Sequence, residues 1–280
     1  MGVVSIDTPD PASPYDALAE LYDEWVVSVV EDVPFYLRVA ELARDAAAGA
    51  PSLTVLELGA GSGRISVPLA LRGCRVIALD TAGGQLARLR MIARAADIPD
   101  EAIELVEGDM LDLDKHVAPA SVDLVIAPFR SLLHVAPQAP EVFAQVRRAL
   151  RAGGLFAFDV FHPDQASVDE FHDRWLLRRR FAAADGNGTW SVWERARFDL
   201  DAHLLELEVR CDFRASATAP EAVVHDDRYA RMELHTPSPH AWRDALEAAG
   251  FAIESVYGWF DDKPFEPGDQ DSIWLARAPA

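Results

Sequence analysis

Residues 55–64 read VLELGAGSGR, and this stretch decides the fold of the chain. Its apolar residues, with Leu53 before them, predict a buried parallel strand that ends in three alternate glycines. Glycine permits a tight turn with positive φ and lets a ligand approach bare backbone amides. The apolar residues from Ile65 onward predict a helix whose N-terminus presents unpaired N–H groups and a partial positive charge to this loop. We therefore expect the loop to hold a nucleotide-like ligand. Its glycines are Gly59, Gly61 and Gly63.

The spacing within the loop narrows the choice of ligand. The dinucleotide fingerprint G-x-G-x-x-G needs a glycine where this chain has Arg64, and the phosphate-binding pattern G-x-x-x-x-G-K-[ST] is absent. An acidic residue, Glu57, stands two positions before the first glycine. A carboxylate repels a diphosphate and attracts a cationic amine or sulfonium. The charge therefore favours a nucleoside that carries an amino acid over NAD or ATP.

Polar residues also follow the later strands of the predicted sheet. The strand over residues 75–79 ends in Asp80, where an acidic side chain can accept hydrogen bonds from ribose hydroxyls. The strand over residues 103–106 is followed by Asp109 and Met110, a carboxylate for an adenine amino group and a thioether to pack on the ring. Further strands are expected over 122–127 and 155–160. The carboxyl ends of such strands line the crevice where an open α/β sheet binds its ligand.

Taken in order, VLELGAGSGR, VIALD, EGDMLDL, VDLVIAPF and LRAGGLFAFDVF resemble the successive motifs of the class I S-adenosylmethionine (SAM)-dependent methyltransferases, over residues 53–161. The resemblance implies a Rossmann-like seven-stranded sheet, SAM as cofactor and S-adenosylhomocysteine (SAH) as product. It places the glycine loop against the methionyl part of SAM, with Glu57 orienting the loop or binding the amino group. It places Asp80 on the ribose and Asp109 with Met110 on the adenine.

The same resemblance adds further cofactor contacts. The carbonyl of Ala127 is expected to accept from the SAM amino group. Arg64 is expected either to pair with the SAM carboxylate or to be a surface arginine at the start of a helix. The remaining motif positions expected beside SAM are Ala60, Thr81, Gly108 and Pro128.

The composition limits the partners. The 280 residues include 46 acidic and 26 basic side chains, a net charge of −20, which repels nucleic-acid backbones and anionic membranes. Two cysteines form no disulfide framework. The chain shows neither a signal peptide nor an apolar run long enough to cross a membrane, so we expect a cytoplasmic protein. His235 and His240 have ligand-like spacing without paired cysteines, so no metal site is expected.

Four parts are expected along the chain. Residues 1–50 form a tail and a cap of two helices, and residues 51–161 form the SAM-binding α/β core. Residues 162–236 form an inserted antiparallel β-sheet, because apolar and charged residues alternate from Leu205 to Arg214. Residues 237–280 add a helix, capped by Ser238, and the last two strands of the core sheet.

This layout is similar to that of amino-sugar N,N-dimethyltransferases and glycine N-methyltransferase. In those enzymes the N-terminal helices and the inserted sheet enclose the acceptor, and N-terminal tyrosines reach the SAM. The similarity implies such a role for Tyr22, also a candidate catalytic residue, and then for Tyr15. The alternative is that both are aromatic residues that anchor an amphipathic helix.

Candidate groups for catalysis and acceptor binding follow from position. His134, shortly after the fourth strand, is the candidate general base, with a structural histidine as the alternative. Arg130 is expected to contact the acceptor or to form an ion pair with Asp123 or Glu141. The inserted sheet offers further acceptor contacts, or else a solvated face or a homodimer contact. These residues are His225, Tyr229 and Arg231.

The sequence therefore predicts a SAM-dependent methyltransferase, class EC 2.1.1.-, that methylates a nitrogen or oxygen of a small molecule. Two alternatives stay open. One is aminopropyl transfer from decarboxylated SAM, which calls for paired acidic residues at the end of the fourth strand, where this chain has Ala127-Pro128-Phe129-Arg130. The other is a SAM-binding module without catalysis. A dehydrogenase is disfavoured by Arg64 at the third glycine position.

Overall fold

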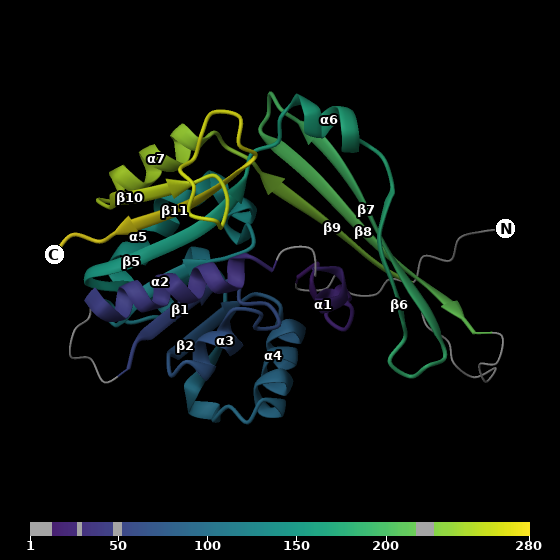
Figure 1. The fold of residues 1–280 in the computed structure, drawn as a ribbon, viewed down its shortest axis with the longest axis horizontal. Helices are drawn as coiled ribbons and strands as arrows, with labels where there is room; N and C mark the ends of the chain where they lie inside the picture. Colours follow the sequence, from purple (N-terminus) through teal and green to yellow (C-terminus); the bar gives the residue numbers. More distant parts are fainter. Residues whose placement is uncertain (1–12, 27–29, 47–51, 217–226) are drawn as a thin grey trace.

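Two β-sheets make up the molecule, a seven-stranded one and a four-stranded one (Figure 1). The computed structural model describes residues 13–26, 30–46, 52–216 and 227–280. The larger sheet has the strand order β10-β11-β5-β4-β1-β2-β3, parallel except for β11, which runs antiparallel to both of its neighbours. Its strands are β1 (Thr54–Leu58), β2 (Arg75–Asp80), β3 (Ile103–Glu107), β4 (Val122–Ala127), β5 (Leu150–Phe161), β10 (Ala252–Tyr257) and β11 (Asp271–Arg277).

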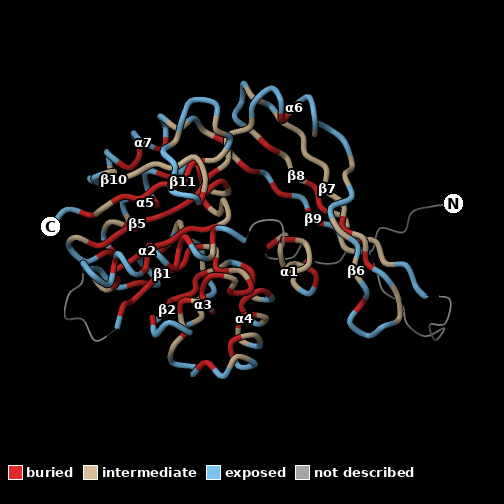
Figure 2. The backbone as a smooth tube through the Cα atoms, in the orientation of Figure 1, coloured by how far each residue is buried: buried red, intermediate tan, exposed pale blue. Residues whose placement is uncertain are grey.

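Helices cover both faces of the seven-stranded sheet, so its central strands are buried (Figure 2), and apolar side chains pack on both of its faces. On one face lie α2 (Asp32–Ala46), α3 (Ser66–Leu71) and α4 (Gly83–Ala95). On the other lie α5 (Ala139–Ala149) and α7 (Pro239–Ala248), the latter capped by Ser238 as expected. Short 3-10 turns link these elements: η2 (Asp100–Ala102), η3 (Met110–Lys115), η4 (Ser131–His134) and η5 (Ala136–Gln138).

The four-stranded antiparallel sheet is inserted between β5 and α7, which confirms the predicted insertion. One of its faces is apolar, because alternate residues such as Val192, Val209 and Met232 are buried there. The sequence predicted neither the first strand of this sheet nor the helix before it. In that strand three consecutive arginines interrupt the alternation of apolar and polar residues. The elements are α6 (Gln165–Phe171), β6 (Leu176–Ala182), β7 (Gly188–Asp199), β8 (Leu204–Ala215) and β9 (Arg228–His235).

The N-terminal segment lies between the two sheets (Figure 1). It contains η1 (Asp16–Leu18) and the four-residue α1 (Tyr22–Trp25), so the expectation of a continuous first helix was wrong. Tertiary contacts explain the break. Leu18 and Leu21 are buried against the inserted sheet, while the carboxylate of Asp16 accepts a hydrogen bond from the Gly84 N–H at 2.9 Å. Together these contacts hold the segment across the carboxyl ends of the core strands.

No helix within the described ranges is both long and apolar enough to span a membrane.

Candidate cofactor and methyl-transfer site

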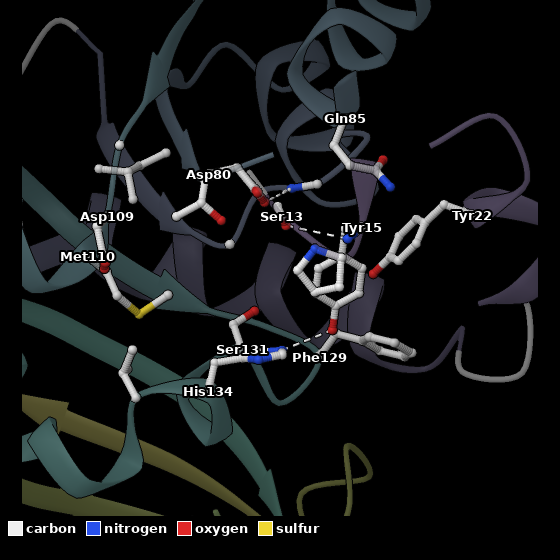
Figure 3. Close-up of a pocket in the computed structure, with 17 residues that line it drawn as sticks. Ser13, Tyr15, Tyr22, Asp80, Gln85, Asp109, Met110, Phe129, Ser131 and His134 are labelled. Atoms are coloured by element: carbon white, nitrogen blue, oxygen red, sulfur yellow. Dashed lines mark hydrogen bonds between the residues drawn. The ribbon is translucent and has the colours of Figure 1, made fainter. Parts of the chain in front are cut away.

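A cavity of about 240 Å³ lies where the carboxyl ends of the core strands meet the N-terminal segment (Figure 3). It occupies the crevice in which open α/β sheets bind their ligands. Its walls come from the N-terminal segment, the glycine loop, the start of α4 and the turns after β2, β3 and β4. The lining residues are Ser13, Pro14, Tyr15, Tyr22, Gly59, Gly61, Leu79, Asp80, Thr81, Gln85, Gly108, Asp109, Met110, Phe129, Ser131, His134 and Val135.

The glycine loop forms one wall because its backbone turns back toward β2. Gly59 and Gly61 line the cavity with φ of +72° and +53°, values that L side chains rarely adopt. At Gly59 a Cβ atom would lie 2.5 Å from the Ser131 hydroxyl. The absence of a side chain therefore lets the loop approach the turn after β4. Gly63 does not line the cavity. A Cβ there would lie 2.5 Å from Leu89 of α4, so this glycine is needed for packing of α3 against α4.

Asp80 ties this loop to the next strand. Its two carboxylate oxygens accept from the Gly61 N–H at 2.7 Å and the Ala82 N–H at 2.8 Å. Burial raises the pKa of Asp80 above its ordinary value. A carboxylate oxygen accepts more than one hydrogen bond, so each oxygen can also take a ligand hydroxyl. The arrangement therefore leaves acceptor capacity for ligand hydroxyls such as those of a ribose.

The turn after β3 closes another side of the cavity. Gly108, Asp109 and Met110 all line it, as does Thr81 from the neighbouring turn. One oxygen of Asp109 accepts from the Leu111 N–H at 2.9 Å and caps η3, which fixes the direction of this carboxylate. The thioether of Met110 lies beside it (Figure 3). A flat apolar ring with a polar edge, such as adenine, suits this pair.

Glu57 lies behind the loop rather than in the cavity. Its side chain is 2 % exposed and accepts a hydrogen bond from the Ser66 hydroxyl. Burial raises the pKa of Glu57 to about 8. The carboxyl group therefore holds β1 to the start of α3, so direct contact with the SAM amino group is not supported.

This raised pKa predicts a pH dependence. Between about pH 4.5 and 8 the folded chain keeps the Glu57 proton that the unfolded chain has lost, so the free energy of unfolding falls as pH rises and levels off above pH 8. Asp159, whose pKa burial raises to about 6, contributes only below that value. We expect Glu57→Gln to remove a slope of up to about 1.4 kcal/mol per pH unit between pH 6.5 and 8, measured by urea unfolding. Equal slopes in wild type and variant would contradict the assignment.

Arg64 serves neither of its two expected roles. Its guanidinium pairs with the buried carboxylate of Asp32 through two hydrogen bonds of 2.7 and 2.5 Å and lies 4.8 Å from the ring centre of Phe129. It does not line the cavity, so pairing with a SAM carboxylate is not supported. The backbone positions Ala60, Ala127 and Pro128 also lie outside the lining. The Pro128 carbonyl accepts from the Ser131 hydroxyl at 2.6 Å.

The turn after β4 is left-handed at two consecutive non-glycine residues. Phe129 and Arg130 have φ of +54° and +63°, and their N–H groups donate to the two oxygens of Asp159 at 2.9 and 3.0 Å. The Tyr36 hydroxyl donates to the same carboxylate at 2.6 Å. This turn directs Phe129 into the cavity. Arg130 instead pairs with Asp271 at 2.7 Å, so it forms an ion pair, but with neither partner that the sequence suggested.

Tyr15 and His134 meet across the cavity. The Tyr15 hydroxyl lies 2.9 Å from His134 Nε2 (Figure 3). Burial lowers the pKa of His134 to about 4 and raises that of Tyr15 well above 10, so at neutral pH the imidazole is uncharged and the phenol is protonated. In the tautomer that carries its proton on Nδ1, the Tyr15 O–H donates to Nε2. Tyr22 packs edge-on against Tyr15, with ring centres 5.8 Å apart.

Comparisons with known proteins agree with this geometry. The family described as Methyltransferase domain matches residues 55–154. Over 133 residues the chain is 35 % identical to malonyl-[acyl-carrier protein] O-methyltransferase of Xylella fastidiosa (strain M23), which covers 47 % of this chain but only 40 % of that relative. Over 253 residues it is 30 % identical to carboxy-S-adenosyl-L-methionine synthase of Pseudomonas putida (strain GB-1), covering 86 % of this chain and 87 % of the relative. The chain belongs to the class I SAM-dependent methyltransferases.

A solved structure supports the fold of this methyltransferase. SAM-bound CalS10, an amino pentose methyltransferase from Micromonospora echinaspora, superposes with a TM-score of 0.62 at 19 % identity and covers 93 % of this chain and 96 % of its own. The likeness includes the inserted region because it extends over nearly all of both chains. SAM is therefore the cofactor, and the glycine loop, Asp80 and the turn after β3 are the elements of this structure that fit it.

Two of the three acceptor contacts expected on the inserted sheet, Tyr229 and Arg231, lie outside the lining of the cavity. The Tyr229 hydroxyl donates to Glu208, and Arg231 pairs with Glu206 at 2.5 Å. Both residues are exposed and alternate with Ala230 and Met232, which are buried on the face toward the N-terminal segment. A role in acceptor binding is therefore not supported for either residue. His225 lies outside the described residues.

Several lining residues of this methyltransferase were not predicted from the sequence. Phe129 and Ser131 follow β4 directly, and their place at a strand end was a signal that could have found them. Gln85 lies in the first turn of α4, shortly after Asp80, and this position near a strand end was a further signal in the sequence. Ser13, Pro14 and Val135 carry no local signal, because tertiary packing alone brings them to the cavity.

Proposed function

We propose that this methyltransferase transfers the methyl group of SAM to a nitrogen or oxygen of a small molecule that binds beside Tyr15 and His134. The observation that carries the proposal is the Tyr15–His134 hydrogen bond of 2.9 Å, in the same cavity as Asp80 and the glycine loop. When bound, SAM supplies an electrophilic methyl group on a sulfonium. The likeness to an amino pentose methyltransferase supports a small acceptor.

The chain's own residues hold the cofactor and exclude water. Asp80 accepts from the ribose, and the bare backbone of Gly59 and Gly61 lets the methionyl part approach the loop. Asp109 and Met110 flank the adenine. The rings of Tyr15 and Tyr22 cover the cavity from the N-terminal side, so the reacting atoms meet in a largely dry space (Figure 3).

Proton removal uses the tautomer of His134 in which Nε2 accepts the hydrogen bond from Tyr15. As the acceptor atom forms its bond to the methyl group, its own proton passes to Tyr15 Oη. Tyr15 gives the proton it held to His134 Nε2, so the tyrosine stays neutral throughout. The imidazole then carries the positive charge until solvent removes the proton. Burial lowers the pKa of His134 to about 4, so at neutral pH the imidazole is uncharged and has a lone pair for the proton.

The charge of the residues that line the cavity limits the chemical class of the acceptor. Among the described residues, no lysine or arginine lines the cavity, while Asp80 and Asp109 both do. Arg64 and Arg130 are held by Asp32 and Asp271 outside it. A neutral or cationic acceptor, such as an amine or an alcohol, is compatible with this field, whereas a carboxylate or phosphate is repelled.

A second candidate comes from the likeness to carboxy-S-adenosyl-L-methionine synthase over most of both chains. In that reaction SAM itself gains a carboxylate. The described lining offers no cation for this new negative charge and holds two acidic side chains instead, so the site supports methyl transfer better.

A turnover screen tests the proposal. Purified protein with SAM is incubated with amines, amino sugars, alcohols and carboxylic acids, and both SAH and carboxy-SAM are quantified by mass spectrometry. SAH formation that depends on a neutral or cationic acceptor supports the proposal. Tight SAM binding without any SAH, or carboxy-SAM as the product, would contradict it.

The proton relay makes a separate prediction. His134→Ala should lower kcat by about 100-fold, because general-base assistance contributes roughly 10²–10⁴-fold. Tyr15→Phe should lower it comparably, since the relay needs both groups. The Kd for SAH should change less than about threefold in His134→Ala, measured by calorimetry. A wild-type kcat in either variant would show that the hydrogen bond is structural.

A further inference from the structure

Gln85 is a buried polar side chain that the fold leaves without a partner. It lies in the first turn of α4, is 1 % exposed and lines the cofactor cavity. Within the described structure, neither Nε2 nor Oε1 of its amide has a hydrogen-bond partner, and both atoms are closed to solvent. Figure 3 shows the amide extending from α4 toward the rings of Tyr22 and Tyr15.

Such an amide calls for an explanation, because native folds rarely leave buried donors and acceptors unpaired. Two neighbouring backbone groups have side-chain partners. The Ala82 N–H donates to Asp80 and the Gly84 N–H donates to Asp16, at 2.8 and 2.9 Å. The amide of Gln85 carries a buried donor and a buried acceptor without a partner among the described residues, and this side chain lies at the wall of a ligand site.

We propose that Gln85 is a further cofactor-binding residue that hydrogen-bonds the ribose hydroxyls of SAM beside Asp80. The inference rests on the proposed function, because it requires the SAM nucleoside in this cavity. Asp80 is a carboxylate and only accepts, so it takes the ribose protons but leaves the oxygen lone pairs of the diol unpaired. The amide N–H₂ of Gln85 supplies the missing donor, and its carbonyl oxygen provides a further acceptor.

Gln85→Met tests the proposal, because methionine keeps the length and volume of glutamine and removes both polar atoms. By calorimetry, the Kd for SAH should rise about tenfold. The Tm of the ligand-free protein should stay the same or rise by about 2 °C, since an unpaired buried amide is lost. Gln165→Met, at an exposed glutamine of α6, is the matched control and should change neither value. Gln85→Glu keeps the acceptor without the donor and should also weaken binding.

Ribose analogues locate the contact. The rise in Kd that Gln85→Met causes is measured with SAH, 2′-deoxy-SAH and 3′-deoxy-SAH. It should be smaller for at least one deoxy analogue than for SAH, because that analogue lacks the hydroxyl to which Gln85 hydrogen-bonds. Wild-type affinity for SAH in both Gln85 variants would overturn the proposal, and so would an equal loss with SAH and with both analogues. If the wild-type protein fails to bind SAH, the proposed function fails with it. The two failures are distinguishable, because the role of Gln85 is tested only when the wild-type protein binds SAH.

Discussion

Asp80→Ala is expected to weaken SAH binding by about 3 kcal/mol, on the order of 100-fold in Kd. The substitution removes a charged acceptor for the ribose, and hydrogen bonds to charged groups contribute about 1.5–3 kcal/mol each. It also leaves the Gly61 and Ala82 N–H groups without the carboxylate that now holds them, so the glycine loop loses its tie to β2. Calorimetry with SAH measures the loss directly.

Asp109→Ala provides the comparison for this result. Asp109 is exposed and accepts one backbone hydrogen bond, from Leu111, whereas Asp80 accepts two. Its loss should therefore cost much less affinity than that of Asp80. If Asp80→Ala bound SAH as tightly as wild type, the ribose would lie elsewhere and the assignment of the cavity would be wrong.

Asp159→Ala is expected to lower the free energy of unfolding by about 3–5 kcal/mol. Asp159 is buried and accepts hydrogen bonds from the Tyr36 hydroxyl and from the Phe129 and Arg130 N–H groups. Without the carboxylate, three buried or half-buried donors lose their acceptor, and the two consecutive left-handed residues lose the backbone hydrogen bonds that stabilise their conformation. Urea unfolding at pH 7.5 measures the change.

Tyr36→Phe separates the two parts of this effect. It removes one of the three hydrogen bonds and leaves the turn anchored, so it should cost about 1 kcal/mol and leave SAH affinity unchanged. In Asp159→Ala, SAH affinity should also fall, because Phe129 no longer lies against the cavity. If the two variants are equally stable, the anchoring role of Asp159 is refuted.

The sequence predicted the core sheet well because local residues mark where each strand begins and ends. The bounds of β4 agree with the prediction to the residue, because a mainly apolar run lies between Ser121 and Pro128. The strand β5 begins at Leu150, five residues earlier than expected, because the stretch of Arg151 to Gly154 reads as a turn but continues the strand. Asp80 was placed correctly at the end of β2 for the same local reason.

Pairings between distant residues could not be predicted. The partner of Arg130 is 141 residues away along the chain, and any of several acidic residues satisfied the local pattern. The alternation along β9 placed Tyr229 and Arg231 on one face, but nothing in it told which face the N-terminal segment would cover. Gln85 was missed because an unpaired amide is visible only once all of its neighbours are placed.

The hydrogen bond between Tyr15 and His134 joins the short N-terminal segment to the core. In the proposed relay, the acceptor's proton therefore has a route only while this segment lies against the core. The ring of Tyr15 also lines the cavity, so proton removal and the exclusion of water depend on the same contact.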